Sequence, residues 1–263
     1  MSKSIAIFLL CLATQFVAFC GAVLVDHAGR LTGDAAGAVQ AVRPATLGAV
    51  QLAADAVLVV LLTLTRLVRR RPLTCGLRTG AAPYVAGVAG VLLAALGLDL
   101  LLQPLALGDG GQMEVFREMS RSVPCVVLLC LVGPLVEELV FREGILHHLG
   151  AAGHGPLGAC IVSALVFGAV HANWAQAVPA VALGFLLGLL YLRTGDIRLS
   201  LPAHVLNNCV AVGLMYVPDG AQPLSGLGAA GAAVPGAVLL AAGLAAVLAG
   251  AAPRFNVKET PRL

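Results

Sequence analysis

The chain has 263 residues, of which 59% are apolar and only 11% are charged, whereas soluble domains carry about a quarter charged residues. A water-soluble fold could not bury so much apolar surface, so the composition predicts a protein that spans a lipid bilayer. The net charge of +3 comes without any basic run interleaved with aromatic residues, so we expect no nucleic acid among its partners.

Apolar runs long enough to be membrane helices follow one another along the chain. They cover residues 4–25, 47–67, 81–102, 123–149, 157–177, 178–193, 199–217 and 227–250. The sequence therefore predicts an all-α fold, a polytopic bundle of about eight transmembrane helices. The first run could be a secretory signal, but its length and its lack of a clean cleavage site favour a retained helix. The run at 178–193 is short, and the sequence does not define its boundary with the run before it.

Lysine and arginine are distributed unevenly between the two sets of loops. With the N-terminus placed in the cytoplasm, twelve basic residues lie on the cytoplasmic side, and four (Arg30, Arg43, Arg117 and Arg121) lie on the other. Cytoplasmic loops carry the excess of basic residues in membrane proteins. We therefore expect both termini in the cytoplasm, in a multi-pass protein of the inner (plasma) membrane.

Residues capable of chemistry concentrate in the second half of the chain. We divide the chain into N-terminal spans with an amphipathic segment (1–122), a polar-containing core (123–217) and a last span with a cytoplasmic tail (218–263). The amphipathic segment, Asp109 to Arg121, predicts a short helix on the outer interface, with a solvated loop as the alternative. The Ala/Gly-rich span from Leu227 to Gly250 has small-residue spacings that suit close helix packing.

The strongest polar cluster lies in the fourth run, where a charged side chain costs at least ~2.5–3.5 kcal/mol on insertion scales. Glu138 and Arg142 are four residues apart, so on a helix they share a face and can form an ion pair. Glu137 is turned away from them by about 100°, which predicts that it faces a cavity as a general base. The alternative places all three at the cytoplasmic lipid boundary, with their ends in water.

The depth of Glu137 depends on where the fourth helix ends. If the helix continues to about Leu149, with the turn at 151–156, Glu137 lies near its middle and can reach His171 on the next run. His204 then lies nearer the cytoplasmic side. The cavity is therefore expected to open toward the cytoplasm.

Two further polar pairs recur at helical spacing. Phe167 and His171 share one face of the fifth run, and His204 and Asn208 share one face of the seventh, with Asn207 off that face. Each has a structural alternative, a hydrogen-bonded core histidine or an interhelical clasp. Together with Glu137, however, they provide a general base, its partner and donors for an oxyanion. That set of groups is suited to hydrolysing an amide.

The remaining polar and sulfur-containing residues have simpler interpretations. Asp55 and Asp99 are isolated acids in the second and third runs and are expected to pair with other helices. His147 and His148 are expected at the interface. The seven cysteines show no zinc spacing, so we interpret them as small buried hydrophobic residues.

The polar motifs resemble the CPBP family of intramembrane proteases, which includes the endoprotease of CaaX-tail processing and the bacterial Abi proteins. The family pattern EExxxR, FxxxH and HxxxN occurs here in order, at Glu137-Glu138-x-x-x-Arg142, Phe167-x-x-x-His171 and His204-x-x-x-Asn208. The intervening stretch GFLLGLLYLRTGDIRLSLPAH is also similar to the family, with its glycine-spaced helix and Tyr-x-x-Thr-Gly turn. The match covers roughly 123–217, which would make that region the catalytic core.

The resemblance implies a role for each matched residue. Glu137 corresponds to the water-activating glutamate and His171 to the residue that assists it, whereas His204 and Asn208 correspond to the pair that stabilises the oxyanion. Glu138, Arg142 and Phe167 would support them. The implied activity is an intramembrane endopeptidase acting on a membrane-associated protein or peptide, such as a prenylated tail, a leader peptide or a C-terminal sorting tail.

The family has been described both as metalloproteases and as glutamate-type proteases. Two histidines and one glutamate could ligate zinc, but the helical HExxH arrangement is absent, so we expect no cofactor and no metal. The alternatives are a zinc-dependent form of the same protease and a non-catalytic binding or immunity protein on the same scaffold. A transporter would more often show inverted halves and broken helices, which the sequence does not show.

Overall fold

The computed structural model describes residues 2–27, 42–68, 81–171, 173–195, 197–217 and 228–250, and every regular element in these ranges is a helix. The expectation of an all-helical membrane bundle is therefore confirmed. Several basic residues counted for orientation lie outside these ranges. Besides the long helix described next, the main helices are α1 (Ser2–His27), α3 (Pro44–Leu64), α4 (Ala81–Leu102), α5 (Gln112–Ser120), α9 (Pro156–Ala169), α10 (Trp174–Thr194), α11 (Ser200–Leu214) and α12 (Gly228–Gly250).

One long helix occupies the centre of the bundle. It is built from α6 (Val123–Val127), α7 (Gly133–Glu137) and α8 (His147–Ala151), which are joined by the π-helical segments Leu128–Val132 and Glu138–Leu146. Wide π turns inside an α-helix are rare and are frequent at functional sites. Together these segments form the 29-residue span Val123–Ala151.

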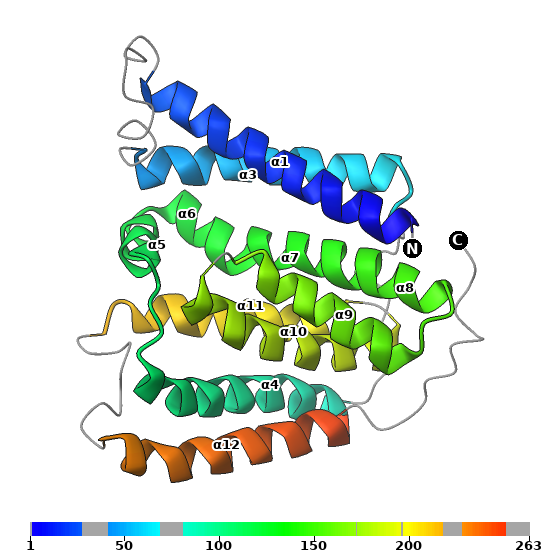
Figure 1. Cartoon of the computed structure of the whole chain (residues 1–263), viewed down its shortest axis with the longest axis vertical. Coiled ribbons are helices and arrows are strands. Elements are labelled where there is room, and N and C mark those ends of the chain that lie inside the picture. The colour runs from blue at the N-terminus through cyan, green and yellow to red at the C-terminus, as the bar shows by residue number, and fades with distance from the viewer. Residues whose placement is uncertain are drawn as a thin grey trace.

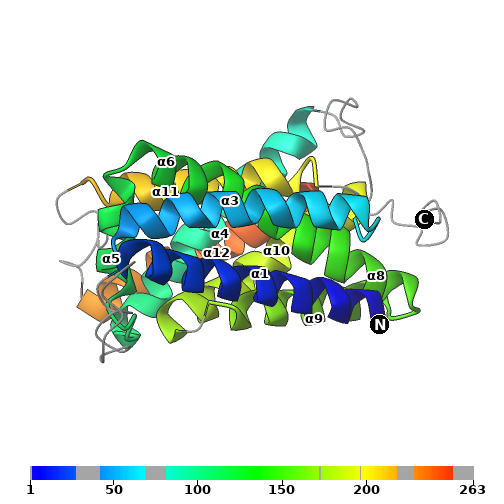
Figure 2. The ribbon, with the colours of Figure 1, turned by 90° about the horizontal axis from the view of Figure 1, so that it is seen from above.

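The helices form three layers (Figure 1). The pair α1 and α3 lies on one side, the long helix with α9, α10 and α11 lies in the middle, and α4 with α12 lies on the other side. Seen from above, the long helices run along a common direction (Figure 2). The start of α1 and the end of α12 lie at the same end of the bundle.

All eight predicted runs are helical in the described ranges, and six helices are long and apolar enough to cross a membrane. Helices α9 and α11, with 14 and 15 residues, are shorter. The number of complete crossings and the cytoplasmic termini stay predictions. The structure corrects one boundary, because the fifth helix ends at Ala169 and the sixth begins at Trp174. The reason is Asn173, whose side-chain oxygen accepts the Gln176 backbone N–H and so caps α10.

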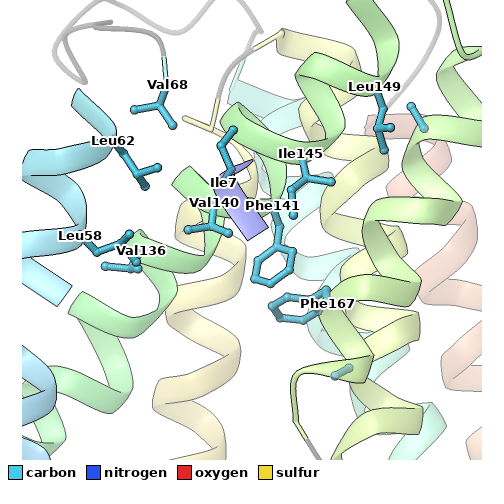
Figure 3. Packing of buried hydrophobic residues seen from close by; sticks show 12 residues of the cluster. Ile7, Leu58, Leu62, Val68, Val136, Val140, Phe141, Ile145, Leu149 and Phe167 are labelled. Carbon is cyan, nitrogen blue, oxygen red and sulfur yellow. The ribbon is translucent and has the colours of Figure 1, made fainter. Parts of the chain in front are cut away.

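An apolar core joins the first layer to the middle layer (Figure 3). Ile7 of α1 and Leu58 and Leu62 of α3 are completely buried against the Val136 side of the long helix. Phe141 packs edge-on against Phe167 of α9, with ring centroids 5.0 Å apart. This contact fixes α9 beside the segment that carries the paired glutamates.

The third layer is packed through glycines, as the small-residue spacings in the last run predicted. A Cβ atom on Gly97 of α4 would lie 2.4 Å from the backbone nitrogen of Leu240 in α12. One on Gly243 of α12 would lie 2.4 Å from the backbone nitrogen of Ala94. The two backbones therefore touch, which only residues without a side chain permit.

The amphipathic segment is a helix rather than a loop. Helix α5 begins after Asp109, whose carboxylate accepts backbone hydrogen bonds from Met113 at 2.8 Å and Gly111 at 3.0 Å. These bonds favour the ionised form, so they lower the pKa of Asp109 below its usual value. Asp109 therefore holds the first turn of α5 in place.

Candidate active site

The long helix carries the paired glutamates at its centre. It continues without a break past Arg142 to Ala151, so the prediction that it runs beyond Arg142 is confirmed. Glu137 is the middle residue of the span Val123–Ala151. Its carboxylate is therefore far from both ends of the helix.

Glu138 and Arg142 form the predicted ion pair, with Arg142 Nη1 and Glu138 Oε1 separated by 3.2 Å. Both side chains are essentially inaccessible, at 0% and 1% exposure. Arg142 Nη2 donates to the backbone carbonyl of Gly184 in α10, and the guanidinium lies 4.8 Å from the centre of the Phe167 ring. These two residues face the interior of the bundle, so for them the alternative of snorkelling to the lipid boundary is wrong.

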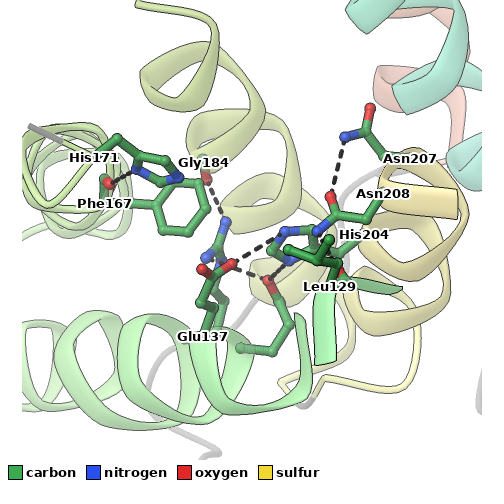
Figure 4. Close-up of polar contacts among 10 residues, drawn as sticks. Leu129, Glu137, Phe167, His171, Gly184, His204, Asn207 and Asn208 are labelled. Atoms are coloured by element: carbon green, nitrogen blue, oxygen red, sulfur yellow. Dashed lines mark hydrogen bonds and ion pairs between the residues drawn. The ribbon is translucent and has the colours of Figure 1, made fainter. Parts of the chain in front are cut away.

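His204 lies between the two glutamates, and Figure 4 shows it beside Glu137. Its Nε2 is 3.3 Å from Glu137 Oε2, and its Nδ1 is 3.1 Å from Glu138 Oε1. The imidazole is buried, whereas the Glu137 side chain is 34% exposed. Within this cluster, Glu137 is the carboxylate that a small molecule such as water can reach.

The depth expected for His204 is wrong. His204 contacts Glu137, the middle residue of the long helix. The start of α11 at Ser200, about 6 Å before His204 at 1.5 Å per residue, therefore lies beside that middle and not at an end of the bundle. At the other end of α11, the Tyr216 hydroxyl donates to the carbonyl of Ser120, just before the long helix begins. Helix α11 thus lies along the first half of the long helix, which removes the reason for expecting the cavity to open toward the cytoplasm.

His171 does not share a helical face with Phe167, because it lies in the turn after α9. Its Nδ1 is 2.8 Å from the Phe167 carbonyl, and its ring centroid is 5.1 Å from that of Phe167. The same Phe167 ring lies 5.8 Å from that of His204. His171 and His204 therefore both contact Phe167, and the His171 ring is directed to Phe167 rather than to Glu137.

Asn208 also faces the long helix, one turn beyond His204. Its side-chain Nδ2 donates to the backbone carbonyl of Leu129 at 3.0 Å, and its Oδ1 accepts a long hydrogen bond of 3.4 Å from Asn207. An amide nitrogen carries two N–H groups, so the contact with Leu129 leaves one for another acceptor. The Leu129 carbonyl is a partner that side-chain patterns did not suggest, although Pro134 in the same run was a signal of broken backbone pairing.

The other polar residues separate into partnered and peripheral groups. Asp55 is buried between α1 and α3, where it accepts hydrogen bonds from Gln15 at 3.3 Å and from Gln51 at 2.8 Å. The prediction that it pairs with another helix is thus met by Gln15. Asp99 is exposed on α4, and His148 is buried with its Nε2 2.9 Å from the Leu67 carbonyl.

The three residues considered as zinc ligands do not converge. In the described ranges, no group of three or more histidine, cysteine, aspartate or glutamate side chains is arranged to hold a metal ion. Glu137 and His204 are in contact, but His171 is directed to the Phe167 carbonyl. The side-chain positions therefore do not fit a zinc site made of Glu137, His171 and His204.

Comparison with known proteins identifies the same region. Residues 119–210 match the family described as "Type II CAAX prenyl endopeptidase Rce1-like". The chain is 28% identical over 170 residues to "Putative membrane peptidase YdiL" of Bacillus subtilis (strain 168), an alignment covering 62% of this chain and 69% of that protein. It is 29% identical over 111 residues to "Uncharacterized protein YpbD" of the same organism, covering 41% of this chain and 54% of the relative. No solved structure matches the chain.

These matches confirm the resemblance drawn from the three motifs, all of which lie inside residues 119–210. They also support a multi-pass membrane protein of the peptidase class. The aligned region spans only about half of the second relative.

Proposed function

We propose that this chain, a member of the Rce1-like family of membrane endopeptidases, hydrolyses a peptide bond within the bilayer by means of a water molecule activated by Glu137. The observation that carries the proposal is the placement of His204 between two carboxylates of unequal exposure. Glu138 is fully buried and paired with Arg142, whereas Glu137 is 34% exposed. The cluster therefore has one structural carboxylate and one accessible carboxylate.

The charges of the cluster support this division of roles. A carboxylate only accepts hydrogen bonds, so His204 satisfies both of its neighbours when both ring nitrogens carry protons. Two carboxylates are then balanced by one guanidinium and one imidazolium. A balanced set is far less costly to bury than an unpaired charge, and it leaves an ionised Glu137 beside a histidine donor.

The reaction follows from this arrangement. Glu137 takes a proton from water as the water oxygen bonds to the carbonyl carbon of the scissile peptide, and the carbonyl oxygen becomes an oxyanion. The proposed donors to that oxyanion are the second amide N–H of Asn208 and the Nε2–H of His204, which turns from Glu137 to the oxyanion once Glu137 has taken the proton. The C–N bond then breaks, and the proton held by Glu137 passes to the leaving nitrogen.

His171 has an assisting role in this proposal. A carbonyl oxygen only accepts, so the contact with Phe167 places the proton on Nδ1 of His171 and leaves Nε2 with a lone pair when the ring is neutral. That nitrogen can accept a hydrogen bond from the attacking water or from a second water molecule. Phe167 positions this ring and also contacts His204 and Arg142.

The substrate is a membrane-associated protein or peptide. The matched family is described as a CAAX prenyl endopeptidase, which makes a prenylated C-terminal tail the first candidate to test. Leader peptides and C-terminal sorting tails also present a peptide bond that an apolar anchor holds at a membrane. These two substrate classes complete the test panel.

The experiment is a cleavage assay with purified full-length protein reconstituted in lipid vesicles, using these three substrate classes. Glu137→Gln should abolish cleavage with an unchanged thermal midpoint, because the amide keeps the shape and loses the base. Glu118→Gln, on the exposed helix α5, is the matched control and should cleave like the parent. If the parent binds a substrate of the panel and never cleaves it, the proposed function is wrong and a binding scaffold is favoured. If Glu137→Gln cleaves normally, Glu137 is not the base and the proposed mechanism is wrong.

A further inference from the structure

The long helix leaves one backbone carbonyl without a helical donor next to the site. In the π-helical segment Leu128–Val132, the backbone N–H of Gly133 donates to the carbonyl of Leu128, five residues back. The next carbonyl in this register is that of Leu129, whose donor would be the backbone nitrogen of residue 134. That residue is Pro134, which has no N–H.

Asn208 supplies the missing donor. Its Nδ2 lies 3.0 Å from the Leu129 carbonyl oxygen. The bond is partly buried, and a carbonyl left without a partner there is costly, so this bond stabilises the contact between α11 and the long helix. The contact exists because Pro134 cannot pair with Leu129 itself.

The bond also fixes the position of α11 along the long helix. His204 is one turn before Asn208 and contacts Glu137 and Glu138 at 3.3 and 3.1 Å. Carbonyls point toward the end of a helix and side chains tilt toward its start, so the Leu129 carbonyl and the Glu137 side chain approach each other along the axis. Two side chains one turn apart on α11 can therefore reach both groups, and both contacts form together.

We propose that Pro134 is a positioning residue for the reaction: by leaving the Leu129 carbonyl to Asn208, it sets the axial position of α11 and thereby holds His204 against Glu137. This inference rests on the proposed hydrolysis. It assigns no contact between Pro134 and substrate, since Pro134 acts through the backbone and Asn208. The two N–H groups of Asn208 then have different roles. One donates to the Leu129 carbonyl and positions α11, and the other is left for the oxyanion.

Pro134→Ala tests the proposal because it restores the missing N–H. The new donor can pair with the Leu129 carbonyl and release Asn208, so turnover should fall by roughly 10- to 100-fold, as expected for an active group displaced by about 1 Å. The thermal midpoint should stay equal or rise, because a proline inside a helix is replaced by the best helix former. Pro235→Ala, the same change inside α12, is the matched control and should leave turnover unchanged.

A second arm does not depend on activity. Asn208→Ala should lower the thermal midpoint of the parent by ~2–4 °C, because one partly buried hydrogen bond between two helices is lost. The same change in the Pro134→Ala background should lower it much less, because the Leu129 carbonyl then has a backbone donor. Equal shifts in both backgrounds would show that the two residues do not share this carbonyl, and would overturn the proposal.

The outcomes distinguish this inference from the proposed function. A parent that cleaves, with Pro134→Ala cleaving equally well or losing both thermal stability and turnover, overturns the positioning role and leaves the function standing. A parent that never cleaves the panel defeats the proposed function and the positioning role with it, while the thermal shifts still decide whether Pro134 directs Asn208 to Leu129.

Discussion

Two helix contacts in this molecule, α4 with α12 and the long helix with α11, are made in opposite ways. The first brings backbones together at glycines, where a Cβ on Gly97 would lie 2.4 Å from a backbone nitrogen. The second joins the helices through His204, two glutamates and an asparagine amide. Apolar burial does not drive helices together in lipid, so close packing and polar contacts are the two available means. The glycine contact is sensitive to side-chain size, and the polar contact is sensitive to charge.

The largest expected effect on stability comes from breaking the buried pair. Arg142→Ala leaves Glu138 fully buried with reduced compensation, and removal of one partner from such a pair typically costs about 3–5 kcal/mol. Glu138→Gln should also destabilise the protein, because it leaves the buried positive charge of Arg142 without its carboxylate partner. We expect a lower thermal midpoint and lower abundance in membranes, measured against Glu137→Gln. Equal folding defects from all three changes would make the whole cluster structural.

The next effect is on turnover. Asn208→Ala removes a proposed oxyanion donor, which typically costs on the order of 10²–10³ in rate, with substrate capture by crosslinking nearly intact. Asn207→Ala is the matched control, because its side chain only reaches Asn208 at 3.4 Å, and it should have little effect. Loss of substrate capture by Asn208→Ala, with turnover per captured substrate unchanged, would assign Asn208 to binding alone.

A smaller effect is expected at the glycine contact. Gly97→Val should force α4 and α12 apart and destabilise the protein by ~1–3 kcal/mol, as overpacking typically does. Gly158→Val in α9, where nothing lies within 4 Å of an added Cβ, should be much milder. The measurement is the thermal midpoint of the purified protein, and similar shifts at both positions would contradict the close backbone contact.

The smallest expected effect is that of metal removal. Exhaustive chelation should leave hydrolysis unchanged, because Glu137, His171 and His204 do not converge as ligands. The measurement is the cleavage rate before and after chelation, together with elemental analysis for zinc. Activity lost on chelation and restored by zinc would assign these residues as ligands after a rearrangement of His171.

The sequence predicts some parts of this structure well, for physical reasons. The apolar runs predict the helices, and the spacing of Glu138 and Arg142 predicts their pairing, because both depend on local helical geometry. The boundary between α9 and α10, which the sequence left undefined, lies before the residues at which the two runs were divided, because the apolar pattern continues across the cap at Asn173. The depth of His204 also differs from the prediction. It depends on which part of the long helix the start of α11 packs against, and this contact joins residues far apart in the sequence.

The partner of Asn208 could not be predicted either. It is a backbone carbonyl, and backbone groups leave no trace in residue patterns unless a proline interrupts the pairing. The π-helical register that offers this carbonyl is rare, and the apolar pattern of the run does not distinguish it from an α-helix. The clearest sequence clue was Pro134, three residues before the paired glutamates.

The length of the central helix has a consequence for bilayers of different thickness. At ~1.5 Å per residue, a helix of 29 residues exceeds a hydrocarbon core about 30 Å thick, and such helices accommodate the mismatch by tilting. Tilting displaces the ends of a rod and leaves its midpoint at the same depth. Glu137 is that midpoint, so thinner or thicker bilayers would reorient the helix around the carboxylate. The distance from the membrane surface at which a substrate is cut would then follow half the bilayer thickness, rather than a fixed offset from either face.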